Sequence, residues 1–254
     1  MRGRVDTCCV VLAVLVLAVT DSTNAVTVTQ TEGQRSASVT FEVKSGGFLE
    51  VTLRNTSGFD VAEPEDVLTA VFFDLAGDPT LTRVSGLLAS GSVVQWANNN
   101  KEKALDGVIG GEWAYQTGLP WPALVVPFGF SGSTGGQSQG ISCVGLDFFD
   151  KFHRFPGDDL QKPDAPNGLN YGLLSKGYGG AGNSAVTGQF PLIQNSVVFV
   201  LGGLPAGFDP ETDVTNVEFQ YGTDLFLIPE PVTMAGLVLG IGCLARYVRR
   251  RRVA

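Results

Sequence analysis

The sequence predicts an all-β protein with a β-sandwich or jelly-roll-like fold, on three observations. Apolar and polar residues alternate with a period of two in several stretches, which is typical of strands with one buried face. Twenty-nine of the 33 glycines fall between Val26 and Pro229, and tight turns between short strands need such glycines. No amphipathic pattern of ten or more residues predicts a long helix in this region.

The expected strands fall into two groups. Alternating patterns predict half-buried strands at Ser38–Val43, Leu49–Leu53 and Asn216–Tyr221. Apolar runs predict more fully buried strands, and these are Val67–Leu75, Ser92–Ala97, Leu124–Phe130, Ile141–Phe149 and Ser196–Leu201. Gly46-Gly47 predicts a hairpin between the first two strands. We expect at most a turn or two of helix, around Glu63–Leu68.

Three segments are expected to be irregular. Ser131–Gly140 and Gly177–Gly188 are rich in glycine and serine, and Phe155–Gly168 contains three prolines. None of them reads as an interdomain linker. We therefore expect one domain over residues 26–228, which is long enough to bury a sizeable core.

Charge is distributed unevenly along the chain. The net charge is −8, but seven arginines lie in the two terminal segments, so residues between Val26 and Pro229 carry 10 basic against 22 acidic side chains. A body with a net charge of −12 has no basic face that could neutralise phosphates. The composition therefore excludes a nucleic-acid-binding function.

The N-terminus has the pattern of a secretory signal peptide. Met1–Asp6 carries two arginines, Val10–Val19 is an unbroken apolar run, and Thr23-Asn24-Ala25 supplies small residues where signal peptidase reads them. A retained transmembrane helix is the alternative, but an apolar run of this length spans about 15–20 Å, against about 30 Å of hydrocarbon. We expect residues 1–25 to be removed by cleavage after Ala25.

The C-terminus has three parts. Pro229-Glu230-Pro231 precedes an uncharged run, Val232–Ala245, which as a helix would measure about 21 Å. A cluster of arginines ends the chain: Arg246, Arg249, Arg250, Arg251 and Arg252. By the positive-inside rule this cluster orients the tail in the cytoplasm and the body outside. The tail could be a permanent anchor, a GPI signal (which normally lacks terminal arginines) or a sorting signal that is removed.

Together, the Pro-Glu-Pro motif, the short apolar helix and the arginine cluster resemble the PEP-CTERM sorting signal of bacterial surface proteins. In that family an integral-membrane enzyme, exosortase, recognises the motif and removes the tail. Two details depart from the usual pattern: Ile228 stands where valine is common, and Thr233 comes one place late. The resemblance implies that residues 229–254 are a sorting signal, and that exosortase and signal peptidase act on the chain during processing.

A second, weaker resemblance concerns the body. The stretch Phe48–Leu81 is similar to extracellular domains that often carry PEP-CTERM signals, and no site residue follows from it. The implied course is export, a transient inner-membrane anchor with a cytoplasmic C-terminus, and then release to the cell surface or extracellular matrix.

Few residues of the body are candidates for chemistry. The chain has one histidine, His153, and its acidic neighbours Asp147 and Asp150 would need a further converging ligand to hold a metal or serve a nucleophile. Cys143 is the one cysteine between the two terminal signals, and its apolar flanks predict a buried, unreactive thiol. We expect no catalytic residues, no metal ligands and no cofactor.

Two loops have weak ligand-binding signals. Asp158, Asp159 and Asp164 could offer carboxylates to a structural Ca²⁺, but their spacing matches no defined calcium loop, and a solvated acidic loop is the alternative. A G-x-G-x-x-G pattern at Gly177–Gly182 lacks the following helix and the acidic residue that a dinucleotide site requires. We interpret it as a flexible loop.

Aromatic residues supply the remaining candidates. Trp96, Trp113 and Trp121 could form a platform for sugar rings, for example of an exopolysaccharide, with core packing as the alternative. We therefore expect a non-enzymatic surface or extracellular-matrix protein. A carbohydrate-binding module is one alternative, and a secreted hydrolase with two paired carboxyl groups is another.

Overall fold

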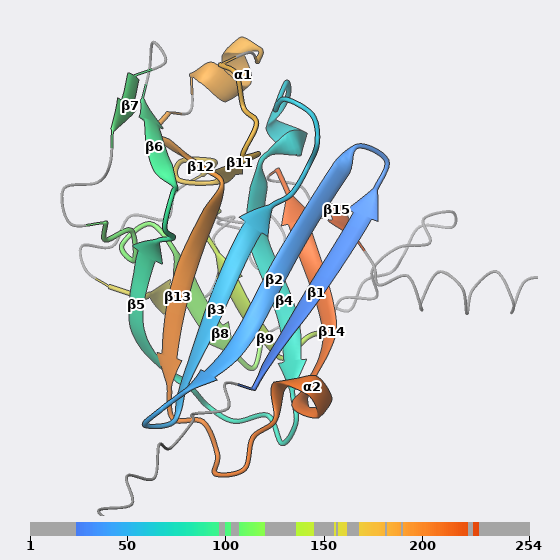
Figure 1. The fold of residues 1–254 in the computed structure, drawn as a ribbon, viewed down its shortest axis with the longest axis vertical. Coiled ribbons are helices and arrows are strands. Elements are labelled where there is room, and N and C mark those ends of the chain that lie inside the picture. The colour runs from blue at the N-terminus through green and yellow to red at the C-terminus, as the bar shows by residue number, and fades with distance from the viewer. Residues whose placement is uncertain are drawn as a thin grey trace, which may run out of the picture.

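The computed structural model describes residues 24–96, 100–102, 107–119, 136–144, 155, 157–161, 168–180, 182–188, 190–222 and 226–228. Most of these residues belong to strands, and the strands form two sheets that lie one in front of the other (Figure 1). This confirms the predicted all-β class. The segment Leu124–Phe130, which was predicted to be a strand, lies outside the described residues.

The first sheet has five antiparallel strands in the order β1-β2-β3-β13-β5. These are β1 (Ala25–Glu32), β2 (Arg35–Lys44), β3 (Phe48–Asn55), β13 (Ser196–Gly202) and β5 (Thr82–Leu88). Gly46 and Gly47 connect β2 to β3 with φ angles of 84° and 75°, which an L-residue with a side chain rarely adopts. The predicted hairpin is therefore confirmed.

The second sheet is centred on β4 (Leu68–Leu75), which pairs with β9 (Gln139–Ser142) and with β14 (Val214–Tyr221). Beyond β9 come β8 (Ala114–Thr117) and β10 (Asp158–Asp159), and β15 (Phe226–Ile228) pairs with β14. Short strands continue the sheet at one end: β11 (Leu173–Leu174), β12 (Leu192–Gln194), β6 (Val93–Trp96) and β7 (Asn100–Glu102).

The described helices are single turns. The 3₁₀ turn η1 (Pro64–Asp66) confirms the helical turn predicted around Glu63–Leu68. Helix α2 (Pro210–Asp213) leads into β14. Helix α1 (Ser184–Thr187) corrects our expectation that Gly177–Gly188 is loop throughout.

A membrane span is not found among the described residues, since none of their helices is long and apolar enough to cross a bilayer. The predicted tail helix, Val232–Ala245, and most of the predicted signal peptide lie outside the described residues.

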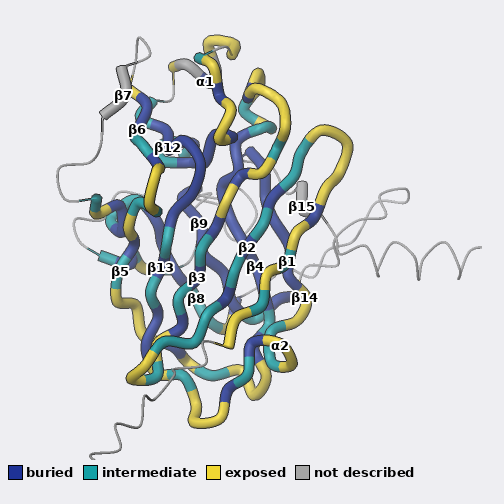
Figure 2. Tube along the Cα trace, in the orientation of Figure 1, coloured by how far each residue is buried: buried dark blue, intermediate teal, exposed yellow. Residues whose placement is uncertain are grey.

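The main core lies between the sheets (Figure 2). Alternate residues of β2 and β3, such as Phe41 and Val51, are fully buried, as their period-two patterns predict. Phe41 meets Phe73 of β4 edge to face, with ring centroids 4.9 Å apart, and Trp113 lies 5.0 Å from Phe199 of β13. Full burial of one such side chain contributes about 1.5–3 kcal/mol to folding.

The second sheet is also covered on its other face. Phe72 points away from Phe73 along β4, and its ring centroid lies 6.5 Å from that of Phe155. Glu218 of β14 lies opposite Phe72 in the register and is buried, and Gln220 is buried as well. The half-buried strand predicted for Asn216–Tyr221 is therefore wrong in burial, because this face of the sheet is covered too.

Gly140 shows a further departure from expectation. The sequence assigns Ser131–Gly140 to a loop, but Gln139 and Gly140 are buried residues of β9. Gly140 lies opposite Phe72, and a Cβ atom on it would meet Phe72 Cδ1 at 2.7 Å and Leu119 Cδ1 at 2.9 Å. The missing side chain makes room for the aromatic ring.

We predict that Gly140→Ala lowers the free energy of unfolding by about 1–3 kcal/mol, because the added methyl group overpacks the site beneath Phe72. Gly58→Ala is the control, since a Cβ atom there would have no neighbour within 4 Å. Thermal unfolding of the full chain, followed by circular dichroism, measures both. Equal stability of the two variants would contradict the packing explanation.

Candidate functional site: the processing junctions and the polar network between them

The predicted signal-cleavage residue lies at the start of the first strand. Ala25 is exposed and pairs with Glu42 of β2, and the carbonyl oxygen of Asn24 accepts a hydrogen bond from the backbone N–H of Val43 at 3.0 Å. Cleavage after Ala25 would leave Val26–Glu32 as the strand. The predicted junction therefore coincides with the beginning of the folded body.

The predicted sorting motif follows the last described strand directly. Within that strand Phe226 pairs with Tyr221 and Ile228 with Phe219. Pro229, Glu230 and Pro231 come next in the chain and lie outside the described residues, as do the tail-orienting arginines, Arg246 and Arg249–Arg252. The folded body thus reaches the residue before the motif.

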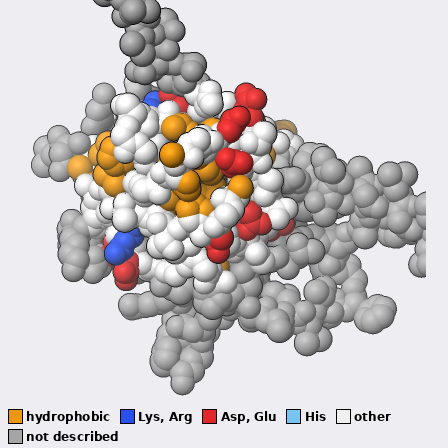
Figure 3. Space-filling model, turned by 90° about the horizontal axis from the view of Figure 1, so that it is seen from below, with side chains coloured by type: hydrophobic (Ala, Val, Ile, Leu, Met, Phe, Trp, Pro, Cys, Tyr) orange, Lys and Arg blue, Asp and Glu red, His pale blue; other side chains and the backbone are white. Residues whose placement is uncertain are grey.

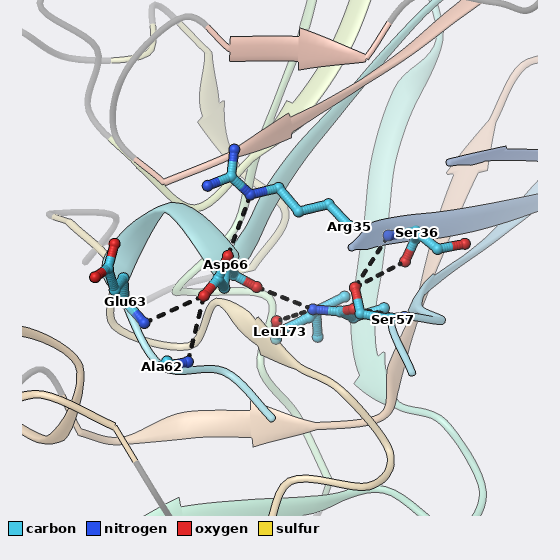
Figure 4. A network of polar contacts seen from close by, with 8 residues as sticks. Arg35, Ser36, Ser57, Ala62, Glu63, Asp66 and Leu173 are labelled. Atoms are coloured by element: carbon cyan, nitrogen blue, oxygen red, sulfur yellow. Dashed lines mark hydrogen bonds and ion pairs between the residues drawn. The ribbon is translucent and has the colours of Figure 1, made fainter. Parts of the chain in front are cut away.

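A network of polar contacts lies where β2 begins and β3 ends (Figure 4). Asp66 of η1 is its centre: Oδ1 accepts a hydrogen bond from Arg35 Nε at 3.2 Å, and Oδ2 accepts from the backbone N–H groups of Ala62 and Glu63 at 3.3 and 3.2 Å. The Arg35 and Asp66 side chains are partly exposed, so the ion pair adds at most about 1 kcal/mol to stability. Its main effect is to hold η1 against β2.

Asn55 carries the buried half of the network. Its Nδ2 donates to the carbonyl oxygens of Leu173 at 2.9 Å and Asp66 at 3.3 Å, and its Oδ1 accepts from the backbone N–H of Ser57 at 3.1 Å. The side chain is fully buried. Asn55-Thr-Ser57 has the form of a glycosylation sequon, but this asparagine amide already bonds three backbone groups.

The network adjoins the end of β14, from which the chain continues to the sorting motif. Burial raises the pKa of the Tyr221 hydroxyl, with Ser57, Arg35 and Asp66 nearby. The next residue, Gly222, donates its N–H to Val67 O at 2.8 Å and accepts from Thr69 Oγ1 at 2.7 Å. The hydrogen bonds of Gly222 therefore fix the backbone at the end of β14.

The three tryptophans do not form one platform. Trp96 ends β6 and is 38% exposed, whereas Trp113 is fully buried. Trp113 packs on Phe199 and donates its indole N–H to Tyr171 O at 3.2 Å, so it belongs to the core and cannot stack on a sugar. Trp121 lies outside the described residues. Among the tryptophans that the structure describes, only Trp96 is therefore exposed to a ligand.

The acidic loop offers little to a calcium ion. Asp158 forms an ion pair with Arg83 at 3.0 Å, and Asp159, its neighbour in β10, directs its side chain to the opposite face of the strand. Asp164 lies outside the described residues. No group of three or more His, Cys, Asp or Glu side chains is placed to bind a metal within the described part of the chain.

Acidic side chains do gather at the end of the molecule that carries α2, as seen from below in Figure 3. In α2 they serve the helix: Asp209 Oδ1 accepts from Glu211 N at 3.1 Å, and Asp213 Oδ2 accepts from Asp209 N at 2.9 Å. This is an N-cap arrangement, which satisfies backbone donors at the helix start. The surface agrees with the acidic composition of the body.

The glycine-rich loop is closed by a carboxylate. Both side-chain oxygens of Asp60 accept hydrogen bonds from the backbone N–H of Gly179, at 3.2 and 3.3 Å. A phosphate would need the N–H groups of this loop, and a carboxylate already occupies one of them. The helix that follows, α1, is a single turn, which is shorter than the helix that opens a dinucleotide site.

Cys143 and Glu112 are two of the groups whose pKa values burial raises. Cys143 is fully buried, which raises the pKa of its thiol, and this agrees with the predicted buried cysteine. Desolvation also raises the pKa of the half-buried Glu112 carboxyl. The negative charge of Glu112 in turn contributes to the raised pKa values of Tyr171 and Cys143. A raised carboxyl pKa suits a general acid, but a hydrolase needs a second carboxyl group facing it. His153 lies outside the described residues.

Comparisons with known proteins give no further identification. The chain matches no protein-family model, no curated protein and no solved structure.

We predict that Asn55→Ala destabilises the protein by about 2–4 kcal/mol, because it leaves the buried Leu173 carbonyl group without its side-chain partner. The part-buried Asp66 carbonyl and Ser57 N–H lose the same partner. Thr56→Ala removes an exposed hydroxyl next to it and is the control, with an expected change below about 0.5 kcal/mol. Chemical denaturation of the full chain compares the two. Comparable losses would show that the amide bonds do not hold this end of the fold.

We predict that Glu112→Gln raises the melting temperature at pH 7 and that the gain disappears in acid. The folded-state pKa of Glu112 lies above its ordinary value of 4.5, so the folded protein favours the protonated form. Ionisation at neutral pH therefore costs stability, and below about pH 4 the carboxyl is protonated in both states. Melting curves from pH 3 to 8 test this, with exposed Glu211→Gln as control. A gain that is independent of pH would contradict the desolvation argument.

Proposed function

We propose that this protein is a non-enzymatic, exported surface or extracellular-matrix protein whose C-terminus is processed by exosortase. The observation that carries the proposal is the layout of the tail: Pro229-Glu230-Pro231, a short uncharged run and a terminal arginine cluster. An uncharged helix of about 21 Å is shorter than the roughly 30 Å hydrocarbon core of a bilayer, so it is poorly suited to be a permanent transmembrane anchor. It is long enough to hold the protein beside a membrane enzyme until the tail is cut.

The ends of the folded body support this course of processing. The first strand begins at Ala25, the residue after which signal peptidase is expected to cut, and the last described strand ends at Ile228, just before the motif. Removal of both terminal segments would leave an acidic two-sheet body, which we propose to be an extracellular β-sandwich of jelly-roll-like form. The membrane anchor would be transient, with the arginine cluster in the cytoplasm.

A non-enzymatic role agrees with the contacts of the candidate residues. Asp66 and Asn55 bond backbone groups, Asp60 bonds Gly179 and Asp158 pairs with Arg83. These side chains are engaged in holding the fold.

A carbohydrate-binding module is the second candidate, and the exposed Trp96 is the observation that favours it. An indole face at the end of β6 could stack on a sugar of an exopolysaccharide. Retention of the full chain on an immobilised polysaccharide, lost on Trp96→Ala, would support this role. Retention that survives the substitution would exclude Trp96 as the contact.

We predict that Glu230→Ala, made in a host with exosortase, blocks removal of the tail. The intact mass of the wild-type protein at the cell surface should correspond to a chain that begins at Val26 and lacks Val232–Ala254. The Glu230→Ala chain should keep the tail and stay in the membrane fraction. Glu211→Ala, an exposed glutamate of α2, is the matched control and should be processed normally.

Two results would overturn the proposal. One is the presence of the arginine-rich tail on wild-type protein exposed at the cell surface. The other is unchanged processing of the Glu230→Ala chain, because the Pro-Glu-Pro motif would then not be what the enzyme reads.

A further inference from the structure

The two edges of the first sheet differ in how they are protected. At the β5 edge the register shifts between Val200 and Leu201, and the segment Gly107–Ile109 lies along the strand. Leu88 N bonds Gly107 O and Ile109 N bonds Gly86 O, both at 2.8 Å, so this edge has backbone partners. Bulges and covering loops of this kind stop edge strands from pairing with other chains.

The β1 edge has no such protection among the described residues. The strand pairs with β2 in unbroken register over all its residues, without proline, lysine or a bulge, and it is uncharged from Ala25 to Thr31. Helix α2 and β15 lie near β1, but β15 pairs with β14 rather than with β1. Figure 1 shows β1 as the outermost strand of its sheet, and Figure 2 shows exposed positions along it.

The hydrogen-bond phase shows which backbone groups face outward. The bond from Val43 N to Asn24 O makes Asn24 a hydrogen-bonded partner of β2, and such partners alternate along an antiparallel strand. The backbone N–H and C=O groups of Val26, Val28 and Gln30 therefore face β2 and bond to it. Ala25, Thr27, Thr29 and Thr31 direct their N–H and C=O groups to the open edge, with their side chains exposed on the outer face.

We propose that β1 pairs with β1 of a second copy of this chain, antiparallel and centred on Val28, so that the two first sheets become one continuous sheet. In this register Thr27 of each copy exchanges hydrogen bonds with Thr29 of the other, and Val28 faces Val28. Paired residues of the two copies direct their side chains to the same face of the joined sheet. The threonines therefore continue its polar outer face, and the valines continue its apolar inner face.

Charge favours this contact over others. The body carries a strong net negative charge, and two copies that approach through most of its surface bring carboxylates together. The stretch Ala25–Thr31 is neutral, and in the proposed register Glu32 of each copy comes opposite Asn24 of the other rather than opposite a second carboxylate. The edge is thus a place where two acidic bodies can meet without like-charge repulsion.

Disulfide trapping tests the pairing and its register. Val28→Cys is placed in the full chain, extracted in detergent, with Cys8, Cys9 and Cys243 replaced by Ser; Cys143 is buried. Facing residues of a non-hydrogen-bonded pair have Cα atoms about 4.5 Å apart, within reach of a disulfide. Mild oxidation should convert most of the protein to a covalent dimer on a non-reducing gel. Thr40→Cys, one strand further in, should give less than about a tenth as much.

A proline then tests whether the outward backbone groups make the contact. Thr29→Pro removes an N–H that bonds nothing within the sheet, so the fold should persist while trapping through Val28→Cys falls about tenfold or more. Thr29→Ala keeps the N–H and should trap as the parent does. No trapped dimer in the parent, or equal trapping with proline and alanine, would overturn the proposal.

Charge pairs give a second test that spares the backbone. Thr27→Glu/Thr29→Glu sets carboxylates opposite each other across the proposed contact and should reduce trapping, whereas Thr27→Lys/Thr29→Glu sets opposite charges there and should restore it. Equal trapping by both double variants would overturn the register. Neither test involves the sorting motif, so failure of the processing proposal leaves these outcomes unaffected.

Discussion

β4 is buried on both faces, and this double burial governs how the neighbouring strands pack. Its side chains alternate between two apolar layers, with Phe73 against Phe41 of the first sheet and Phe72 near Phe155 on the other side. β9 and β14 flank it, so its backbone groups are bonded as well. Such a strand admits little adjustment, and its neighbours have to fit it. The glycine at position 140 and the buried polar side of β14 are two consequences of that fit.

Buried strands also require hydrogen-bond partners for their backbone groups, and polar side chains of the body provide them. Where strands end inside the protein, their last backbone groups need partners that the ladders no longer provide. Asn55 supplies three such bonds, Asp66 closes the turn before β4, and Thr69 holds the end of β14. Residue types that in other proteins bind metals or substrates are here committed to the backbone.

The edges of the sheets lie next to the two junctions at which we propose that the chain is processed. β1 is both the first strand after the predicted signal peptide and an unprotected edge, and β15 is both the last described strand and the approach to the predicted sorting motif. The termini of the body thus lie at edges rather than in the core. The same placement leaves β1 available to a second copy.

Local patterns predicted a large part of this fold. The alternation of β2 and β3, the Gly46-Gly47 hairpin, the apolar run of β4 and the helical turn of η1 appear where the sequence indicated, because side-chain period and turn chemistry depend on neighbouring residues. The errors concern distant contacts. Gly140 was assigned to a loop because its contact with the ring of Phe72 joins residues far apart in the sequence. Glu218 was expected on the exposed face of its strand, but that face of the second sheet is covered.

For the candidate site, too, some features could be predicted from the sequence and others depend on the folded structure. The all-β class, the acidic body and the burial of Cys143 could be predicted from the chain alone, since charge and local patterns of apolar residues are properties of the sequence. The two terminal signals are predictions of the same kind. The folded arrangement was needed to show that Trp113 is core while Trp96 is exposed, and that Asn55 bonds Leu173. It was also needed to show that β1, unlike β5, has no backbone partner on its outer edge among the described residues. Burial and pairing are relations between residues far apart in the chain, and only the folded arrangement sets them.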